Sequence, residues 1–255
     1  MTISSSQESL GGKRAIFSGR EGLEFSMAGQ RAFVILPPEA SPIREQPWVW
    51  YAPTLPGLPG DEEKWMFQKF LDSGVAIAGI DVGESYGSPA GSVHFTTFHR
   101  YLISDRGFAP KPGLLARSRG GLMLYNWAIE HAESVACIAG IYPVCNLASY
   151  PGLAKACGAF GLTESELAAH LIEHNPFERL APLARAHVPI LHLHGDQDEI
   201  VPLAENSTLL AERYRQEGGE IQLLVFPGRG HDRWSGWFES QDLVDFLLAH
   251  VRTRT

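Results

Sequence analysis

The 255-residue sequence predicts an α/β protein with a mostly parallel sheet that is covered by helices on both faces. Three observations predict this class. Short apolar runs bounded by Gly, Pro and Asp alternate with segments of helical periodicity, as in repeated strand-helix-strand units. The run 136–141 is almost wholly apolar, which is typical of a strand covered on both faces. A content of 44% hydrophobic and 20% charged residues fits a globular protein and argues against a disordered chain.

The first 14 residues are polar and rich in Ser and Gly, so residues 1–14 are predicted to be a flexible N-terminus and residues 15–255 a single domain. Asp61 is a helix-capping residue type at the end of a Pro/Gly-rich loop, and Pro110 and Pro112 mark the exit of a later helix. The elements expected in this part are an antiparallel strand at 32–36, a strand at 48–51, a helix from Asp61 to about Leu71, a strand at 75–80 and a helix that ends near Ile103.

The rest of the chain continues the alternation of strands and helices. The longest connection, 142–188, contains a Thr163/Glu166 capping box and is predicted to carry a small lid. The elements expected here are strands at 114–116, 136–141, 190–194 and 221–226, and helices at 119–131, from Thr163 to about Asn175, from Pro202 to about Gln216 and at 239–251.

A serine lies at the predicted turn between the strand at 114–116 and the next helix. The sequence there is Ala116-Arg117-Ser118-Arg119-Gly120-Gly121, with a small residue two positions before the serine and glycines two and three positions after it. A strand that turns abruptly into a helix holds its central residue in a strained backbone conformation, which small neighbours tolerate. The spacing predicts a nucleophile elbow at Ser118. A Ser-Gly loop that only caps the helix is the alternative.

A serine hydroxyl needs a base, and His231 is the histidine best placed to supply one. It lies in Gly228-Arg229-Gly230-His231, just after the last predicted strand, where glycines let the loop bend over the strand ends. Asp198, in the loop after the strand at 190–194, is predicted to orient the imidazole. Asp196 is instead predicted to be a turn residue that binds nearby backbone amides.

These residues, in this order, resemble the α/β-hydrolase superfamily, which includes serine esterases and prolyl-oligopeptidase-like peptidases. The resemblance rests on Ala116-Arg117-Ser118-Arg119-Gly120, His194-Gly195-x-x-Asp198-x-x-Val201-Pro202 and Gly230-His231. It extends from about Ala32 to the C-terminus and implies an eight-stranded, mostly parallel sheet with the triad on loops at one edge. It says less about the substrate, because this fold supports many reactions.

The loop after the third strand of these hydrolases often reads His-Gly, and this chain departs from that pattern. It reads Ala52-Pro53-Thr54-Leu55-Pro56-Gly57, in which the prolines have no N–H to offer an oxyanion. The backbone amide of Arg119, at the start of its helix, is expected to be one oxyanion donor. Thr54 or Leu55 is expected to provide the other.

Arginines and aromatic residues close to the predicted triad are candidates for a substrate pocket. Arg117 and Arg119 flank the nucleophile and either contact an anionic group of the substrate or, as we favour, pair with carboxylates of the protein. Tyr86, Trp234 and Trp237 either line the mouth of the site, where they would suit a sugar ring or aryl group, or pack in the core.

The predicted function is hydrolysis of a carboxylic ester through an acyl-enzyme, on a small acyl or sugar ester, with no cofactor and no metal. A peptidase or amidase of the same fold is one alternative, and a non-catalytic binding protein of this fold is another. A metal site formed by His192, His194, Asp196 and Asp198 is disfavoured because the turn at Gly195 ends the strand before the aspartates.

The net charge and the cysteine content restrict the classes of binding partner and the cellular compartment that the sequence predicts. A net charge of -8 disfavours nucleic acid as a partner, and no run of 18 apolar residues predicts a membrane span. Three cysteines, Cys137, Cys145 and Cys157, cannot all pair within one chain, although a Cys145–Cys157 bridge stays open. The absence of a secretory signal in the first residues favours a cytoplasmic location. A homo-oligomer is left open.

Overall fold

The structure is a computed structural model that describes residues 12–38 and 45–252. Most of the segment predicted to be flexible, residues 1–11, lies outside the described residues. Its end does not fit the prediction, because Lys13 and Arg14 belong to the first strand, where they pair with Glu24 and Leu23.

The described residues form a nine-stranded sheet in the order β1-β2-β3-β5-β4-β6-β7-β8-β9. The strands are β1 (Lys13–Phe17), β2 (Arg20–Met27), β3 (Gln30–Ile35), β4 (Trp48–Ala52), β5 (Ala76–Ile80), β6 (Gly113–Arg117), β7 (Cys137–Ile141), β8 (Ile190–Gly195) and β9 (Ile221–Phe226). The helices are η1 (Asp61–Glu63), α2 (Lys64–Asp72), α3 (Pro89–Arg106), α4 (Gly120–Glu130), η2 (Ala132–Ser134), α5 (Leu153–Phe160), α6 (Glu164–Ala169), α7 (Leu171–His174), η3 (Pro176–Glu178), α8 (Ala181–Arg185), η4 (Leu203–Glu205), α9 (Ser207–Gln216), α10 (Ser235–Phe238) and α11 (Gln241–Val251).

Strands β4 to β9 pair in parallel, as the fold class predicts, and β1 to β3 form an antiparallel meander that joins the sheet at β5. The prediction of eight strands is therefore wrong by one. The meander turns at Ser18-Gly19 and Ala28-Gly29, four residues with positive φ, which is the backbone conformation that tight hairpins require. The strand expected at 32–36 is the last of its three strands.

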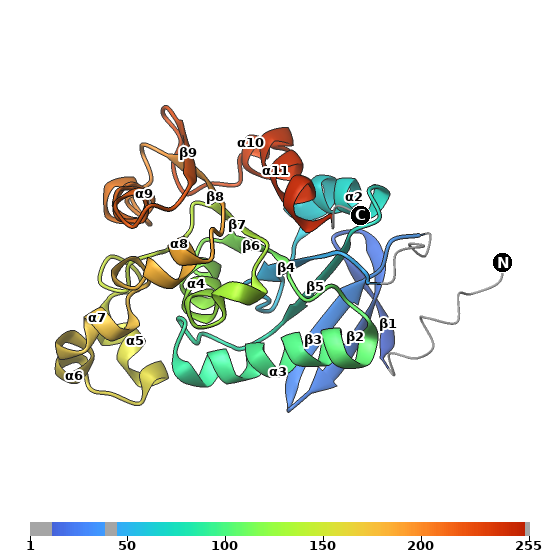
Figure 1. The fold of residues 1–255 in the computed structure, drawn as a ribbon, viewed down its shortest axis with the longest axis horizontal. Coiled ribbons are helices and arrows are strands. Elements are labelled where there is room, and N and C mark those ends of the chain that lie inside the picture. The colour runs from blue at the N-terminus through green and yellow to red at the C-terminus, as the bar shows by residue number, and fades with distance from the viewer. Residues whose placement is uncertain (1–11, 39–44, 253–255) are drawn as a thin grey trace.

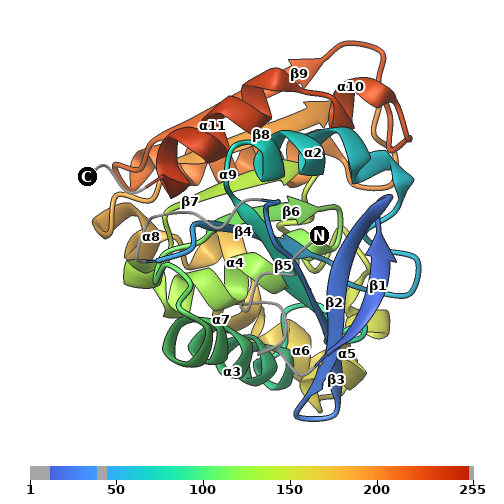
Figure 2. The same cartoon turned by 90° about the vertical axis from the view of Figure 1, so that its right-hand side faces the viewer.

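Successive side chains of the central strands point to opposite faces of the sheet, so the core is divided between the two faces. On β4, Trp48 and Trp50 pack with the side chains of α3 and α4, whereas Val49 and Tyr51 pack with those of α2 and α11. Figures 1 and 2 show the resulting three layers, with α2 and α11 on one face and α3, α4 and α8 on the other. No helix in the described part of the chain is both long enough and apolar enough to cross a bilayer.

The long connection from β7 to β8 carries α5 to α8. The predicted capping box is present, since Thr163 N–H donates to Glu166 Oε2 over 2.8 Å and Glu166 N–H donates to Thr163 Oγ1 over 3.3 Å. The single helix expected there is broken at His170 into α6 and α7. Leu167 of α6 joins an apolar cluster that also contains Leu122 of α4. The lid stays a prediction.

Candidate active site

Ser118 occupies the turn between β6 and α4 with a φ of +50°, the strained conformation predicted for a nucleophile elbow. The backbone is fixed on both sides, because Ser118 N–H donates to the Ile141 carbonyl over 3.0 Å and the Ser118 carbonyl accepts from Val144 N–H over 2.8 Å. A Cβ on Gly120 would collide with the Ala52 carbonyl oxygen, and one on Gly121 with that of Val144. The glycines are therefore required by the close approach of two neighbouring loops.

His231 lies beyond the end of β9, and its Nε2 is 2.9 Å from the Oγ of Ser118. A Cβ on Gly195 would collide with the Arg229 carbonyl oxygen, so the glycine at the end of β8 lets the histidine loop lie directly over that strand. The ring of Tyr142 packs against the imidazole with centroids 4.2 Å apart and limits its rotation. Folding thus brings together two side chains that are 113 residues apart in sequence.

Asp198 is 5% exposed and holds the other side of the imidazole, with 2.8 Å between its Oδ2 and His231 Nδ1. Its Oδ1 accepts from the backbone N–H groups of Ile200 and Val201 over 3.0 and 2.8 Å. Burial raises the pKa of the Asp198 carboxyl, but hydrogen bonds from His194, His231 and Val201 outweigh burial and hold that pKa well below its usual range. The acid is therefore a carboxylate throughout the neutral range and fixes a proton on His231 Nδ1.

A buried polar network supports Asp198 from behind. His194 Nε2 lies 2.8 Å from the Val201 carbonyl and 3.4 Å from Asp198 Oδ2, so in the neutral imidazole this nitrogen carries the proton. His194 Nδ1 then accepts from Ser207 Oγ over 2.7 Å, and Ser207 in turn accepts from His192 Nδ1 over 2.9 Å. Tyr125 completes the network by donating its hydroxyl to His192 Nε2 over 2.7 Å. Every donor in this series of hydrogen bonds points toward the Asp198 carboxylate.

The same contacts bear on the disfavoured metal site. The ring nitrogens of His192 and His194 are occupied by protein hydrogen bonds. Asp196 accepts from the Gly228 N–H over 2.7 Å, which is a bond to the histidine loop and not to an amide of its own turn. Across residues 12–38 and 45–252, no three His, Cys, Asp or Glu side chains are grouped so that they could hold a metal ion. All three cysteines are free thiols.

Arg117 and Arg119 pair with carboxylates of the protein, which is the interpretation the sequence favoured. The guanidinium of Arg117 lies 2.6 Å from the buried carboxylate of Glu63, which also accepts from the Tyr51 hydroxyl over 2.8 Å. Arg119 pairs with the exposed Glu84. Sequence reasoning missed Glu63, because nothing in an acidic run such as 61–63 shows which carboxylate turns inward.

Of the expected oxyanion donors, Arg119 is the N-cap residue of α4, where backbone N–H groups lack an intrahelical acceptor. Thr54 is buried and its hydroxyl donates to the Ile80 carbonyl over 2.7 Å, so only its backbone amide is left for an oxyanion. Leu55 uses its carbonyl to accept from Leu58 N–H over 2.8 Å, which closes a turn. The assignment of the oxyanion amides stays a prediction.

A cavity of about 400 Å³ opens over the Ser118 hydroxyl. Its walls come from the loop after β4, the elbow, Tyr142 and the histidine loop, and its lining residues are Pro53, Pro56, Gly57, Leu58, Arg117, Ser118, Arg119, Tyr142, His231, Asp232 and Arg233. Sequence reasoning missed Tyr142, although its position directly after β7 places it at the same sheet edge as Ser118.

Among the four predicted pocket residues, only Arg117 lines this cavity. Tyr86 packs in the apolar cluster of α4 and α6. Trp237 is fully buried against Tyr142, and Trp234 packs on Phe226 and under the Arg229 guanidinium. The prediction of an aromatic mouth is therefore wrong for these three side chains, because the packed core competes for aromatic surface and sequence does not show which way a loop residue turns.

Part of the chain resembles a known protein family in sequence. The sequence profile of the prolyl oligopeptidase family matches residues 95–253, more than half of the chain. Acylamino-acid-releasing enzyme 2 of Oryza sativa subsp. japonica is 29% identical over 135 residues, which are 49% of this chain and 17% of that enzyme. The match therefore spans less than a fifth of the length of this relative.

Solved structures resemble the chain over most of its length. An S-formylglutathione hydrolase from Agrobacterium tumefaciens superposes with a TM-score of 0.73 at 14% identity and covers 94% of this chain and 99% of that protein. A puromycin-hydrolyzing peptidase of Mycobacterium tuberculosis gives a TM-score of 0.68 at 16% identity, over 92% of this chain and 40% of the peptidase. At these identities the likeness shows the α/β-hydrolase fold.

Proposed function

Because the chain belongs to the prolyl oligopeptidase family and is a serine hydrolase of the α/β-hydrolase fold, we propose that Ser118, His231 and Asp198 are its catalytic triad. One observation carries the proposal. The Oγ of Ser118, held at a positive φ, lies 2.9 Å from His231 Nε2, whose Nδ1 lies 2.8 Å from the buried Asp198. Nucleophile, base and orienting acid are within hydrogen-bonding distance in the order that acyl transfer needs.

In the acylation step, Ser118 Oγ attacks the carbonyl carbon and His231 Nε2 takes the hydroxyl proton. Negative charge then builds on the former carbonyl oxygen, where the Arg119 amide and the amide of Thr54 or Leu55 donate hydrogen bonds. The carbon–oxygen bond to the alcohol breaks as His231 returns the proton to the leaving oxygen. Asp198 stabilises the imidazolium that exists between these two proton transfers.

In the deacylation step, a water molecule repeats the attack on the acyl-enzyme. His231 removes one water proton, the tetrahedral intermediate forms at the same oxyanion donors, and the bond to Ser118 Oγ breaks as the proton returns to the serine. Deacylation releases a carboxylic acid and regenerates the Ser118 hydroxyl. The two steps need no oxidant, reductant or cofactor.

The proposed substrate is a carboxylic ester of small acyl size. The catalytic cavity of about 400 Å³ suits a small acyl group, and an S-formylglutathione hydrolase superposes on 94% of the chain at the level of fold. A peptide or amide bond is the second candidate, favoured by the family and by the acylamino-acid-releasing relative.

The test is turnover of p-nitrophenyl acetate and butyrate against p-nitroanilides of amino acids, with wild type and Ser118→Ala. We expect ester hydrolysis that falls by a factor on the order of 10⁴ or more in Ser118→Ala. Labelling of the wild type, but not the variant, by a fluorophosphonate identifies the nucleophile. Undiminished turnover in Ser118→Ala refutes the triad, anilide turnover above ester turnover favours the peptidase, and absence of both turnover and labelling favours a non-catalytic binding protein.

A further inference from the structure

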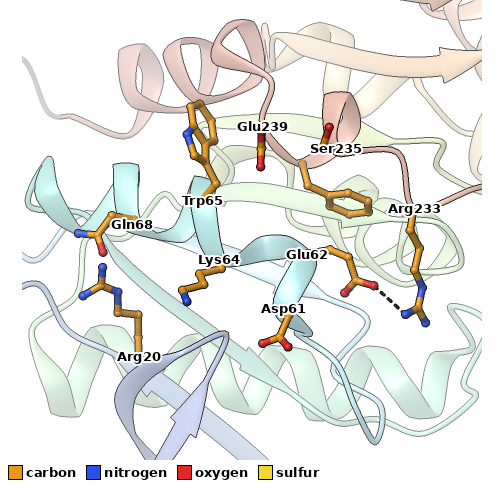
Figure 3. A pocket seen from close by; sticks show the side chains of 10 residues that line it. Arg20, Asp61, Glu62, Lys64, Trp65, Gln68, Arg233, Ser235 and Glu239 are labelled. Carbon is orange, nitrogen blue, oxygen red and sulfur yellow. Dashed lines mark ion pairs between the residues drawn. The ribbon is translucent and has the colours of Figure 1, made fainter.

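A second cavity of about 450 Å³ lies between the start of α2 and α10, next to the catalytic cavity. Figure 3 shows the side chain of Trp65 on one side of this second cavity and the dashed Glu62–Arg233 ion pair on the other. Phe238 also lines this cavity, but it is 1% exposed and contributes little surface. The volume is within the range of small-molecule binding pockets.

The Glu62–Arg233 ion pair separates the second cavity from the catalytic cavity. Arg233 lines both cavities. One carboxylate oxygen of Glu62 lies 2.9 Å from Arg233, and the other lies 3.9 Å from Arg117, which lines the catalytic cavity. The side chain of Arg233 is 79% exposed, so packing does not hold it in place and it costs little to displace. Arg233 is therefore a wall that both cavities share, and its displacement would let a substrate extend from one into the other.

The lining of the second cavity indicates what it accepts. Arg20, Lys64 and Arg233 contribute positive charge, and an equal number of acidic side chains, Asp61, Glu62 and Glu239, contribute negative charge. The formal charges of these six side chains therefore sum to zero, and the lining as a whole does not select for one sign of charge. Trp65, which is only partly buried, instead offers flat apolar surface, which favours an uncharged aromatic group.

We propose that the second cavity binds an uncharged aromatic group of the substrate, remote from the bond that is cleaved. This inference rests on the proposed function, since it takes Ser118 as the point at which the substrate is anchored. The preferred substrates are esters in which a spacer carries an aromatic ring past the Glu62–Arg233 pair to Trp65. The ring belongs either to the acyl part or to the alcohol part.

The test compares esters that differ only in the remote group. The acyl series uses p-nitrophenyl esters of a phenylalkanoic acid and of a straight-chain acid with the same number of carbons. The alcohol series uses acetates of a phenylalkanol and of the matching straight-chain alcohol. We expect the aromatic member of one series to have the higher kcat/KM, and the series in which this occurs identifies the part of the substrate that enters the second cavity.

Trp65→Ala is expected to lower the ratio of aromatic to straight-chain kcat/KM by about tenfold through KM, the equivalent of about 1.4 kcal/mol. Trp65→Leu keeps apolar volume but removes the flat ring and is expected to lower the same ratio. Lys69→Met is the matched control, because the Lys69 amine lies 5.2 Å from the Trp65 ring on the same helix but does not line the cavity. This control is expected to leave the ratio unchanged.

Binding without turnover separates this inference from the proposed function. Calorimetric titration of the Ser118→Ala protein with a phenylalkanol is expected to show saturable binding that weakens about tenfold in Ser118→Ala/Trp65→Ala. That result supports the second cavity even if the protein hydrolyses no ester. An aromatic preference and binding that are the same with and without Trp65 overturn the inference and leave the triad untouched.

Discussion

Two ion pairs flank Ser118, and they are built in opposite ways. Arg117 and Glu63 are 10% and 0% exposed, and the same Glu63 carboxylate also accepts from Gly60 N–H over 2.8 Å. Arg119 and Glu84 are 32% and 42% exposed. The first pair joins the elbow to η1, whereas in the second pair Arg119 lines the catalytic cavity.

Burial determines how much each of these ion pairs contributes to the stability of the protein. A buried carboxylate that loses its partner keeps the full cost of desolvation, so the Arg117–Glu63 pair is expensive to break. An exposed pair exchanges its contacts for water, so the Arg119–Glu84 pair contributes little. Two arginines two residues apart therefore play different parts: Arg117 holds the fold around the nucleophile, and Arg119 offers the site a backbone amide.

The buried pair gives the largest expected effect. Glu63→Gln removes the charge but keeps the side-chain shape, and it leaves the buried Arg117 guanidinium with only the more distant Glu62 carboxylate, 3.9 Å away. We expect the free energy of unfolding to fall by about 3–5 kcal/mol. Urea denaturation monitored by circular dichroism measures this change, and a loss below about 1 kcal/mol would show that Arg117 finds another partner.

The buried histidine network makes the stability of the protein depend on pH in the acid range. Burial, with a smaller effect from His194, lowers the pKa of His192 from 6.5 to about 3. Between these two values the unfolded chain binds a proton that the folded protein does not, so stability falls as the pH drops below 6.5. From near pH 7 to about pH 4.5, His192 alone is expected to remove about 3 kcal/mol.

His192→Asn isolates this effect. The variant loses hydrogen bonds to Tyr125 and Ser207 and is expected to be less stable near neutral pH, but its further loss on acidification is smaller by about 3 kcal/mol. Urea unfolding of both proteins at the two pH values gives the difference. Equal acid sensitivity in wild type and variant would mean that other groups control acid unfolding.

The exposed pair gives the smallest expected effect. Glu84→Gln is expected to change the free energy of unfolding by about 0–1 kcal/mol, with ester turnover close to wild type, because the Arg119 backbone amide stays in place. The same urea titration and a p-nitrophenyl acetate assay measure both quantities. A loss as large as that of Glu63→Gln would break the distinction between the two pairs.

Sequence patterns predicted the parallel part of the fold well because its strands are apolar on both faces. The run 136–141 and the apolar stretch at 190–194 coincide with β7 and β8 within one residue at either end. Strands β1 and β2 escaped prediction because they form an edge of the sheet with many exposed polar residues, and such strands resemble loops in composition.

Site residues were predictable from sequence where the backbone conformation of a turn requires a particular residue type. Small residues around Ser118, and glycines beside His231, follow from the turns that present these side chains. The surroundings were less predictable, because the direction of a loop side chain depends on distant packing. Trp237 follows His231 closely in sequence and is nonetheless in the core, whereas Glu62 and Arg233 form an ion pair although they are 171 positions apart (233 − 62).

The proposed triad and the aromatic wall at Trp65 come from separate stretches of the polypeptide. Ser118, Asp198 and His231 all fall inside the family match at 95–253, and Trp65 precedes it. Chimaeras that exchange the whole N-terminal portion with another hydrolase would keep the three triad residues but would replace Thr54, Leu55 and Glu63 together with the wall at Trp65. Substitutions confined to position 65 can instead vary selectivity without rebuilding the reacting groups.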